Sequence, residues 1–341
     1  MAHFLRSRFL LLTSGFFFFF ILFILCWHLF IPPSRIASTK IICIKKGTSL
    51  KKVSEILEQE GVIKNKQFFI FLATLLGKKA KVKAGEYELH TQMLPLEVYD
   101  ALVQGQVKRH LVTIPEGYTL LQIAQLLENM NLVDKKAFLQ RASSPSLINA
   151  LGLSQLAGPN LEGYLFPDTY HLIKETEPEE IIQMMVNRFK KVFDSGLAEE
   201  ASEVGFSERE AVILASIVEK ESSLPEEKPL ISAVFHNRLK KKIPLQSDPT
   251  VIYGIKNFNG NLTKEDLLRP TPYNTYLITG LPPTPICNPG KDSLLASVRP
   301  AAVPYLYFVS KNDGSHYFSC DIQEHNQAVS KYQKRFLQEK R

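Results

Sequence analysis

The run 211–218 is almost entirely apolar and ends at two glutamates, Glu219 and Glu221. Ser207 and Glu210, just before the run, have the spacing of a capping box, so a helix is predicted to begin directly after Ser207. Because only one residue of the run is polar, this helix has no face that suits water. The chain must therefore adopt a fold that encloses the helix, and the two glutamates lie where the helix leaves the core.

The two glutamates are two residues apart, so on a helix they point about 200° away from each other and cannot act as one pair. Glu221 continues the apolar stripe formed by Leu214, Ile217 and Val218. Apolar surroundings raise the pKa of a carboxyl group. A carboxylic acid that is still protonated near neutral pH can donate its proton to a glycosidic oxygen, so Glu221 is predicted to be a general acid.

Glu219 points to another side of the helix and is predicted to be auxiliary. A glutamate at a helix end is commonly a solvated charge or one partner of a salt bridge. Lys220 and Arg238 are the cations expected to pair with Glu219. The same plain interpretation applies to Glu221, so its surroundings decide between a surface charge and an acid catalyst.

The N-terminal segment Phe9–Ile31 carries no formal charge and is long enough to span a bilayer. It ends in aromatic residues and prolines rather than in the small residues of a signal-peptide cleavage site, so an uncleaved anchor is predicted. More cations follow the span than precede it, but Arg6 and Arg8 lie closest to it and long domains are translocated largely regardless of charge. The predicted orientation therefore places residues 1–8 in the cytoplasm and the bulk of the chain outside.

The composition fits a globular protein of two or three domains, since 45% of the 341 residues are hydrophobic and 22% are charged. The formal net charge of +7 predicts an anionic neighbour, and outside the cytoplasm this means phospholipid head groups or an acidic polymer rather than nucleic acid. The four cysteines and eight histidines show no ligand-like spacing. No disulfide framework, metal site or cofactor is therefore predicted.

An internal repeat relates Ile44–Phe69 to Ile114–Leu139, without gaps, at an offset of 70 residues. Each copy predicts a short strand, a glycine turn at Gly47 or Gly117, and two helices. The residues expected near the helix starts are Ser49 and Lys64 in the first copy and Thr119 and Asp134 in the second. A glycine turn that leads into a small strand–helix–helix–strand unit resembles a LysM-like module, which implies glycan binding.

Further elements follow from hydrophobic periodicity and turn signals. The predicted ranges are a strand at Ala84–His90, helices at Pro95–Val103, Pro178–Asp194 and Lys228–Lys241, and a hairpin of Tyr305–Val309 with His316–Ser319. The loops between them are rich in aromatic, hydroxyl and amide side chains, which suit a sugar ligand. The same loops are equally typical of turns that proline and asparagine hold in one conformation.

Several segments, taken in order, resemble the endolytic murein transglycosylase family of YceG-like proteins over about residues 40 to 335. They are LEGYLFPDTY, ASIVEKES, VFHNRL, LQSDPTVIYG, YNTY, GLPP, NPG, YLYF, HYF and EHN. The resemblance implies an α+β protein with residues 9–31 as a single transmembrane helix, 40–108 as a LysM-like α/β subdomain and 109–341 as a YceG-like α+β catalytic domain. It also implies a single-pass enzyme of the inner membrane with its catalytic part in the periplasm.

The resemblance further implies cleavage of newly made peptidoglycan strands between N-acetylmuramic acid and N-acetylglucosamine. The product would carry a 1,6-anhydro end, and the enzyme would act as a terminator of glycan elongation with peptidoglycan synthases as neighbours. In the family's E-K-E motif the second glutamate is catalytic, and that position is Glu221 here. One carboxyl can serve as acid and then as base in such a reaction.

Polar residues in the shared segments are the candidates for substrate contacts: Glu162, Gln246, Asp248, Tyr273, Asn274 and Thr275. Two other classes of function remain open from the sequence. A muramidase-type hydrolase would use Glu221 together with Glu162 or Asp248 as its second carboxylate. A noncatalytic, membrane-anchored glycan-binding protein would release no fragments at all, so the chemistry of the products separates the three possibilities.

Overall fold

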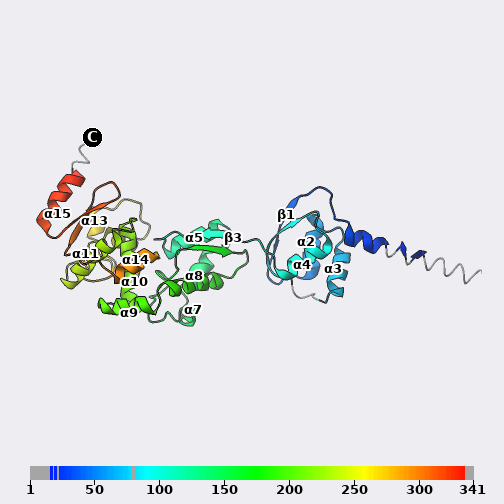
Figure 1. The fold of residues 1–341 in the computed structure, drawn as a ribbon, viewed down its shortest axis with the longest axis horizontal. Coiled ribbons are helices and arrows are strands. Elements are labelled where there is room, and N and C mark those ends of the chain that lie inside the picture. The colour runs from blue at the N-terminus through cyan, green and yellow to red at the C-terminus, as the bar shows by residue number, and fades with distance from the viewer. Residues whose placement is uncertain (1–15, 18, 21–22, 78–81, 335–341) are drawn as a thin grey trace, which may run out of the picture. The chain divides into compact units, whose positions relative to one another are not determined.

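The computed structural model describes residues 16–17, 19–20, 23–77 and 82–334, which form two compact units (Figure 1). The first unit comprises the chain up to Leu111 together with His171–Thr176, and the second comprises Val112–Tyr170 and the chain from Glu177 onward. The described strands form three two-stranded sheets, which accompany a larger number of helices. The prediction of an α+β protein is therefore confirmed.

The predicted cytoplasmic tail and most of the first half of the predicted membrane span lie outside the described residues. Residues 16–17, 19–20 and 23–30 are helical. Within the described ranges, no helix has both the length and the apolar character needed to cross a membrane. A membrane span at Phe9–Ile31 accordingly stays a prediction.

The first unit contains a strand, two helices, a second strand and a third helix, in the order predicted for a strand–helix–helix–strand module (Figure 1). The two strands are antiparallel, with Ile42 opposite Tyr87. The predicted strand and helix after the first repeat are confirmed to within one residue at each end. The elements are β1 (Thr39–Ile44), α2 (Leu50–Gln59), α3 (Lys66–Leu75), β2 (Gly85–His90) and α4 (Pro95–Gln104).

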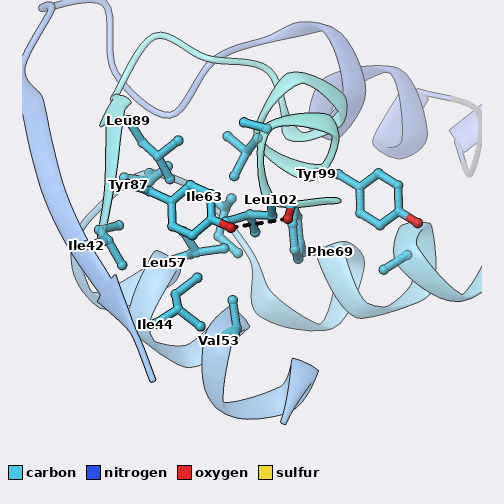
Figure 2. Close-up of a cluster of buried hydrophobic side chains, with 14 residues drawn as sticks. Ile42, Ile44, Val53, Leu57, Ile63, Phe69, Tyr87, Leu89, Tyr99 and Leu102 are labelled. Atoms are coloured by element: carbon cyan, nitrogen blue, oxygen red, sulfur yellow. Dashed lines mark hydrogen bonds between the residues drawn. The ribbon is translucent and has the colours of Figure 1, made fainter. Parts of the chain in front are cut away.

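A buried tyrosine crosses the core of the first unit, as Figure 2 shows. Tyr87 is fully buried between aliphatic side chains such as Ile44 and Leu57. Its hydroxyl donates to the backbone oxygens of Lys83 at 2.7 Å and Leu102 at 3.3 Å. Burial raises the pKa of Tyr87 to about 12. The two backbone oxygens give the buried hydroxyl its hydrogen-bond acceptors inside the core.

The internal repeat is confirmed by the backbone of both copies. Gly47 and Gly117 adopt positive φ angles of 80° and 75°, which glycine tolerates best. The side chains of Ser49 and Thr119 cap α2 and α5 (Leu120–Asn129), as predicted. The second helices, α3 and α6 (Lys135–Ala142), begin after Asn65 and Asp134, one residue later than predicted in the first copy.

A glutamate that recurs in both copies joins the two helices of each copy. The carboxylate of Glu58 accepts from the backbone N–H of Lys66 at 2.9 Å, and that of Glu128 accepts from the N–H of Lys135 at 3.2 Å. Each carboxylate therefore satisfies a free N–H at the start of the second helix, where negative charge is favoured.

From residue 110 onward the chain is mainly helical (Figure 1). The predicted helices and the C-terminal hairpin are confirmed, with small shifts at their ends. The helices at Pro145–Ala150, Ser195–Glu203, Lys264–Leu267 and Lys291–Val298 and the strand at Thr169–Leu172 were not predicted. Besides α5 and α6, the elements are β3 (His110–Thr113), α7 (Pro145–Ala150), β4 (Thr169–Leu172), α8 (Pro178–Val192), α9 (Ser195–Glu203), α10 (Glu208–Glu221), α11 (Lys228–Lys240), α12 (Asp248–Gly254), α13 (Lys264–Leu267), α14 (Lys291–Val298), β5 (Tyr307–Ser310), β6 (His316–Ser319), α15 (Ile322–Val329) and the π-helical turn η1 (Ser330–Lys334).

Helix α10 lies at the centre of the second unit. Every residue from Ala211 to Val218 is buried, and the predicted capping box between Ser207 and Glu210 is present. Helices α9, α11, α12 and α14 pack around it. The prediction of an enclosed helix is confirmed, and its C-terminal end carries Glu219 and Glu221 to the edge of this core.

Candidate active site

Glu221 is the last residue of α10, and its side chain is partly buried. One carboxyl oxygen accepts a 2.5 Å hydrogen bond from the Ser247 hydroxyl. Burial raises the pKa of Glu221 to about 7, and the negative charge of Asp248 adds to the rise, while the Ser247 bond and the Arg238 charge oppose it. The direction of this shift agrees with the one expected from the helical stripe, and a carboxyl with such a pKa can hold a proton near neutral pH.

Glu221 lines a cavity of about 260 Å³. Segments far apart in the sequence meet there: the end of α10, α11, the loop that leads into α12, the loop after α13, the C-terminal hairpin and α15. The cavity is mainly polar, with two carboxylates, a guanidinium, an amide, a phenol and an imidazole. Its lining residues are Glu221, Arg238, Leu245, Gln246, Asp248, Tyr276, Phe308 and His325.

Gln246 is one of the predicted substrate-binding residues that the structure places in this cavity. Its backbone has a φ of 52°, an uncommon conformation for a residue other than glycine. The N–H of Gln246 donates to the Thr275 carbonyl at 3.0 Å, and its side-chain oxygen accepts from Arg238 at 3.2 Å. Backbone strain of this kind is typical of functional sites.

Asp248 is the second predicted residue that lines the cavity, and it opens α12. Its carboxylate accepts a 2.6 Å hydrogen bond from the Tyr276 hydroxyl. Burial, followed by this hydrogen bond, raises the pKa of Tyr276, so the phenol keeps its proton and holds Asp248 in place. Glu221 and Asp248 are the two carboxylates among the lining residues of this cavity.

Glu162 lies elsewhere, in an internal hydrogen-bond network. Its side chain is 4% exposed and accepts from the Leu120 N–H at 2.9 Å, the Asn288 amide at 3.1 Å and the Tyr253 hydroxyl at 3.1 Å. Burial raises the pKa of Glu162 to about 7, and these three hydrogen bonds oppose the rise. The carboxyl does not line the cavity that contains Glu221.

The remaining predicted contacts, Tyr273, Asn274 and Thr275, do not line that cavity either. Asn274 is fully buried and bonds backbone groups of its own loop. Tyr273 shares a 2.7 Å hydrogen bond with the hydroxyl of Thr284. Thr275 is also fully buried, and its hydroxyl accepts from the N–H of Ser247 at 3.0 Å. Thr275 therefore holds the loop that carries the hydrogen-bond donor to Glu221.

Glu219 forms a buried ion pair, but with a different cation from the two that were predicted. Its carboxylate accepts from Lys228 at 3.2 Å, from the Gly290 N–H at 2.9 Å and from the Ser293 hydroxyl at 2.6 Å. Sequence proximity suggested Lys220, which instead approaches a backbone carbonyl. Glu219 thus fixes the start of α14 against the end of α10, which is the auxiliary position expected of it.

Four polar residues at the site were not predicted as part of it: Ser247, Arg238, Tyr276 and His325. His325 stacks on Tyr307 with 5.1 Å between ring centroids, and its buried Nδ1 has no hydrogen-bond partner among the described residues. Arg238 donates to the carbonyls of Leu245 and Leu306. These residues belong to the segments QSDPT, NRL, YNTY and EHN, which were recognised as motifs of the family. Nothing in the sequence showed which residues of each segment would line the cavity.

No group of three or more histidine, cysteine, aspartate or glutamate side chains in the described part of the chain is placed to hold a metal ion.

An acid-lined cavity at the end of an enclosed helix, in an α+β unit, is the kind of site that general acid–base enzymes use. The sequence model of the YceG-like family matches residues 42–331, so the chain belongs to the YceG-like family. A crystal structure of a YceG-like protein from Listeria monocytogenes is similar, with a TM-score of 0.59 and 32% sequence identity. The similarity covers 86% of this chain and all of that one.

Two curated relatives are named endolytic murein transglycosylase. The protein from Bacillus subtilis (strain 168) is 32% identical over 308 residues, which cover 86% of this chain and 85% of the relative. The protein from Streptococcus pneumoniae serotype 2 is 30% identical over 318 residues, which cover 85% of this chain and 57% of the relative. The chain therefore spans most of the first relative and little more than half of the second.

Proposed function

We propose that this protein is an endolytic murein transglycosylase that cuts peptidoglycan glycan strands between N-acetylmuramic acid and N-acetylglucosamine. The observation that carries the proposal is Glu221, a carboxyl with a pKa of about 7 that lines a polar cavity. The names of its relatives supply the substrate class. The cavity volume lies just below the roughly 300 Å³ at which ligand pockets begin.

In the proposed reaction, protonated Glu221 gives its proton to the glycosidic oxygen as the bond to C1 of the muramic acid breaks. The resulting carboxylate then accepts the proton of the C6 hydroxyl of the same sugar, while O6 bonds to C1. The products are a free 4-hydroxyl on the leaving sugar and a 1,6-anhydromuramic end, and no water is consumed. Glu221 finishes the cycle protonated, so a single carboxyl is sufficient.

Ser247 has a direct role in this cycle. Its hydroxyl bonds the Glu221 carboxyl at 2.5 Å, and a hydrogen bond to a carboxylate is stronger than one to a neutral acid. Ser247 therefore stabilises the base form that the second step requires. Asp248 lines the same cavity. Its negative charge would stabilise the positive charge that develops on the sugar between the two steps.

A muramidase-type hydrolysis is the second candidate, because Asp248 shares the cavity with Glu221. A hydrolase needs a second carboxylate as nucleophile or as the base that activates water. Asp248 would fill this role, since Glu162 is enclosed in its own hydrogen-bond network. The two reactions differ in their products, since hydrolysis leaves a reducing end and adds one water.

In the cell, we expect Phe9–Ile31 to anchor the protein in the inner membrane with residues 1–8 in the cytoplasm. The two units would then lie in the periplasm, where the first, LysM-like unit would bind glycan strands and the second would cut them. Cleavage of strands near the membrane would make the protein a terminator of glycan elongation, with peptidoglycan synthases as neighbours. A reporter fused after Arg341 that is active only in the cytoplasm would contradict this orientation.

The proposal is tested by digesting uncrosslinked glycan strands and weighing the products by mass spectrometry. The wild-type protein should release anhydromuramic ends, which are lighter than reducing ends by one water. Glu221→Gln keeps the size of the side chain but has no proton to transfer, so the rate should fall roughly 100-fold to 10,000-fold. Glu162→Gln is the matched control, because it makes the same change outside the cavity and should cut at the normal rate.

Each outcome of this digestion separates the candidate functions. Reducing ends would favour the hydrolase, and binding to strands without any fragments would favour a noncatalytic glycan-binding protein. A Glu221→Gln protein that released anhydro products at the wild-type rate would overturn the role of Glu221 itself.

A further inference from the structure

Helix α3 of the first unit carries large apolar side chains that the rest of the unit does not cover. Phe71 is 54% exposed and Leu75 is 71% exposed, and Leu76 directly after the helix is 40% exposed. The helix contains no acidic residue, and its only charge is Lys66. Large apolar groups gathered on one exposed helix commonly mark a surface that another molecule or a membrane covers.

The exposed stripe begins where α3 meets the helical residues 23–30. The ring of His28 stacks on Phe68 with 4.9 Å between centroids, and α3 lies beside this dark blue segment in Figure 1. Phe68, Phe71 and Leu75 are three and seven residues apart, so they follow one side of the helix. The apolar side that contacts His28 therefore continues outward along α3.

The segment at residues 23–30 has the features of a chain that leaves a bilayer. Phe23, Trp27 and Phe30 are all more than 45% exposed, although they are aromatic. The ammonium group of Lys64 lies 4.6 Å from the centre of the Trp27 ring. Tryptophan is enriched at the membrane–water interface, and the Lys64 ammonium group holds the Trp27 ring against the first unit.

We propose that α3 lies on the surface of the phospholipid bilayer, with Phe71, Leu75 and Leu76 at the boundary between head groups and acyl chains. The apolar stripe and the exposed aromatic side chains of residues 23–30 then form one continuous lipid-facing surface, and the partly exposed Lys66 suits anionic head groups. The first unit is thus held against the membrane rather than tethered freely. This inference rests on the anchor in the proposed function and adds a second contact to it.

The chain contains a single tryptophan, Trp27, so fluorescence reports on one position at a time. The full-length protein is reconstituted in vesicles of phosphatidylethanolamine and phosphatidylglycerol, with and without bromine on the acyl chains. Native Trp27 reports on the anchor. In a Trp27→Phe background, Leu75→Trp reports on α3, and Leu96→Trp is the matched control on an exposed leucine of α4.

Brominated lipid should reduce the fluorescence of Leu75→Trp by roughly half, because an interfacial helix buries its apolar face roughly 5–10 Å into the bilayer. The fluorescence of Leu96→Trp should stay unchanged. Quenching of Trp27 without quenching of Leu75→Trp would overturn the contact of α3 and leave the anchor intact, as would equal quenching of Leu75→Trp and Leu96→Trp. If Trp27 were not quenched either, the anchor would fail together with this proposal.

Discussion

Replacing Glu162 by glutamine should make the protein more stable at neutral pH than the wild type. The Glu162 carboxyl is 4% exposed, and burial raises its pKa from 4.5 to about 7. One pKa unit is worth about 1.4 kcal/mol, so keeping the ionised carboxylate buried costs about 3 kcal/mol. Glutamine carries no charge, and its amide can accept from Leu120 and Asn288 and donate to the Tyr253 oxygen in place of the acid.

The pH dependence follows from the direction of the pKa shift. Below the unfolded pKa of about 4.5, Glu162 is protonated in both states and its contribution to stability is fully present. As the pH rises toward 7, the unfolded chain releases the proton while the folded protein retains it, so the stability contributed by this proton is lost. The free energy of unfolding of Glu162→Gln should therefore exceed that of the wild type by near zero in mild acid and by about 3 kcal/mol above pH 7.

Urea unfolding, followed by circular dichroism at a series of pH values, measures this difference for a protein that starts at Thr39. The matched control is Glu199→Gln, which changes an exposed glutamate of α9 and should leave the pH dependence unaltered. A difference that does not vary with pH, or that falls as the pH rises, would refute the reasoning. It would mean that the three hydrogen-bond donors keep Glu162 ionised in the folded protein.

Three other measurements address the end of α10. The value of kcat/KM should fall as the pH rises through about 7, because Glu221 must be protonated in the free enzyme, and a pH–rate profile checks this. Ser247→Ala should move that falling limb to higher pH, since the Ser247 bond lowers the pKa of Glu221, and should reduce kcat/KM roughly tenfold through loss of a bond to a charged group. Glu219→Ala should lower the stability by about 3 kcal/mol in thermal unfolding, because it leaves Lys228 buried without its nearest carboxylate, and adding Lys228→Met should recover part of the loss.

The sequence predicted those parts of the fold that depend on neighbouring residues. The start of α10 follows from the capping box, and its enclosure follows from an apolar run without a polar face. The repeated units follow from matching turns and caps, which the backbone of both copies reproduces. The direction of the pKa shift of Glu221 could also be predicted, because the spacing of the apolar residues in the sequence shows that Glu221 follows the apolar side of the helix.

The parts that were not predicted depend on contacts between distant residues. Helix α14 is short, and the carboxylate of Glu219, some seventy residues earlier, fixes its start through Gly290 and Ser293. Asn274 and Gln246 look equally suited to bind a sugar in the sequence. The structure turns the amide of Asn274 toward backbone carbonyls and that of Gln246 toward the cavity, and only tertiary packing makes this distinction.

The capping box and the carboxyl group of Glu219 together fix the rotational register of α10. The capping box holds its first turn, and the contacts of Glu219 hold its last. One residue inserted between Ser207 and Glu219 would turn every later side chain by about 100°, so the acid would leave the cavity while the ion pair lost its partner. The length of α10 is thus set by the contacts at its two ends.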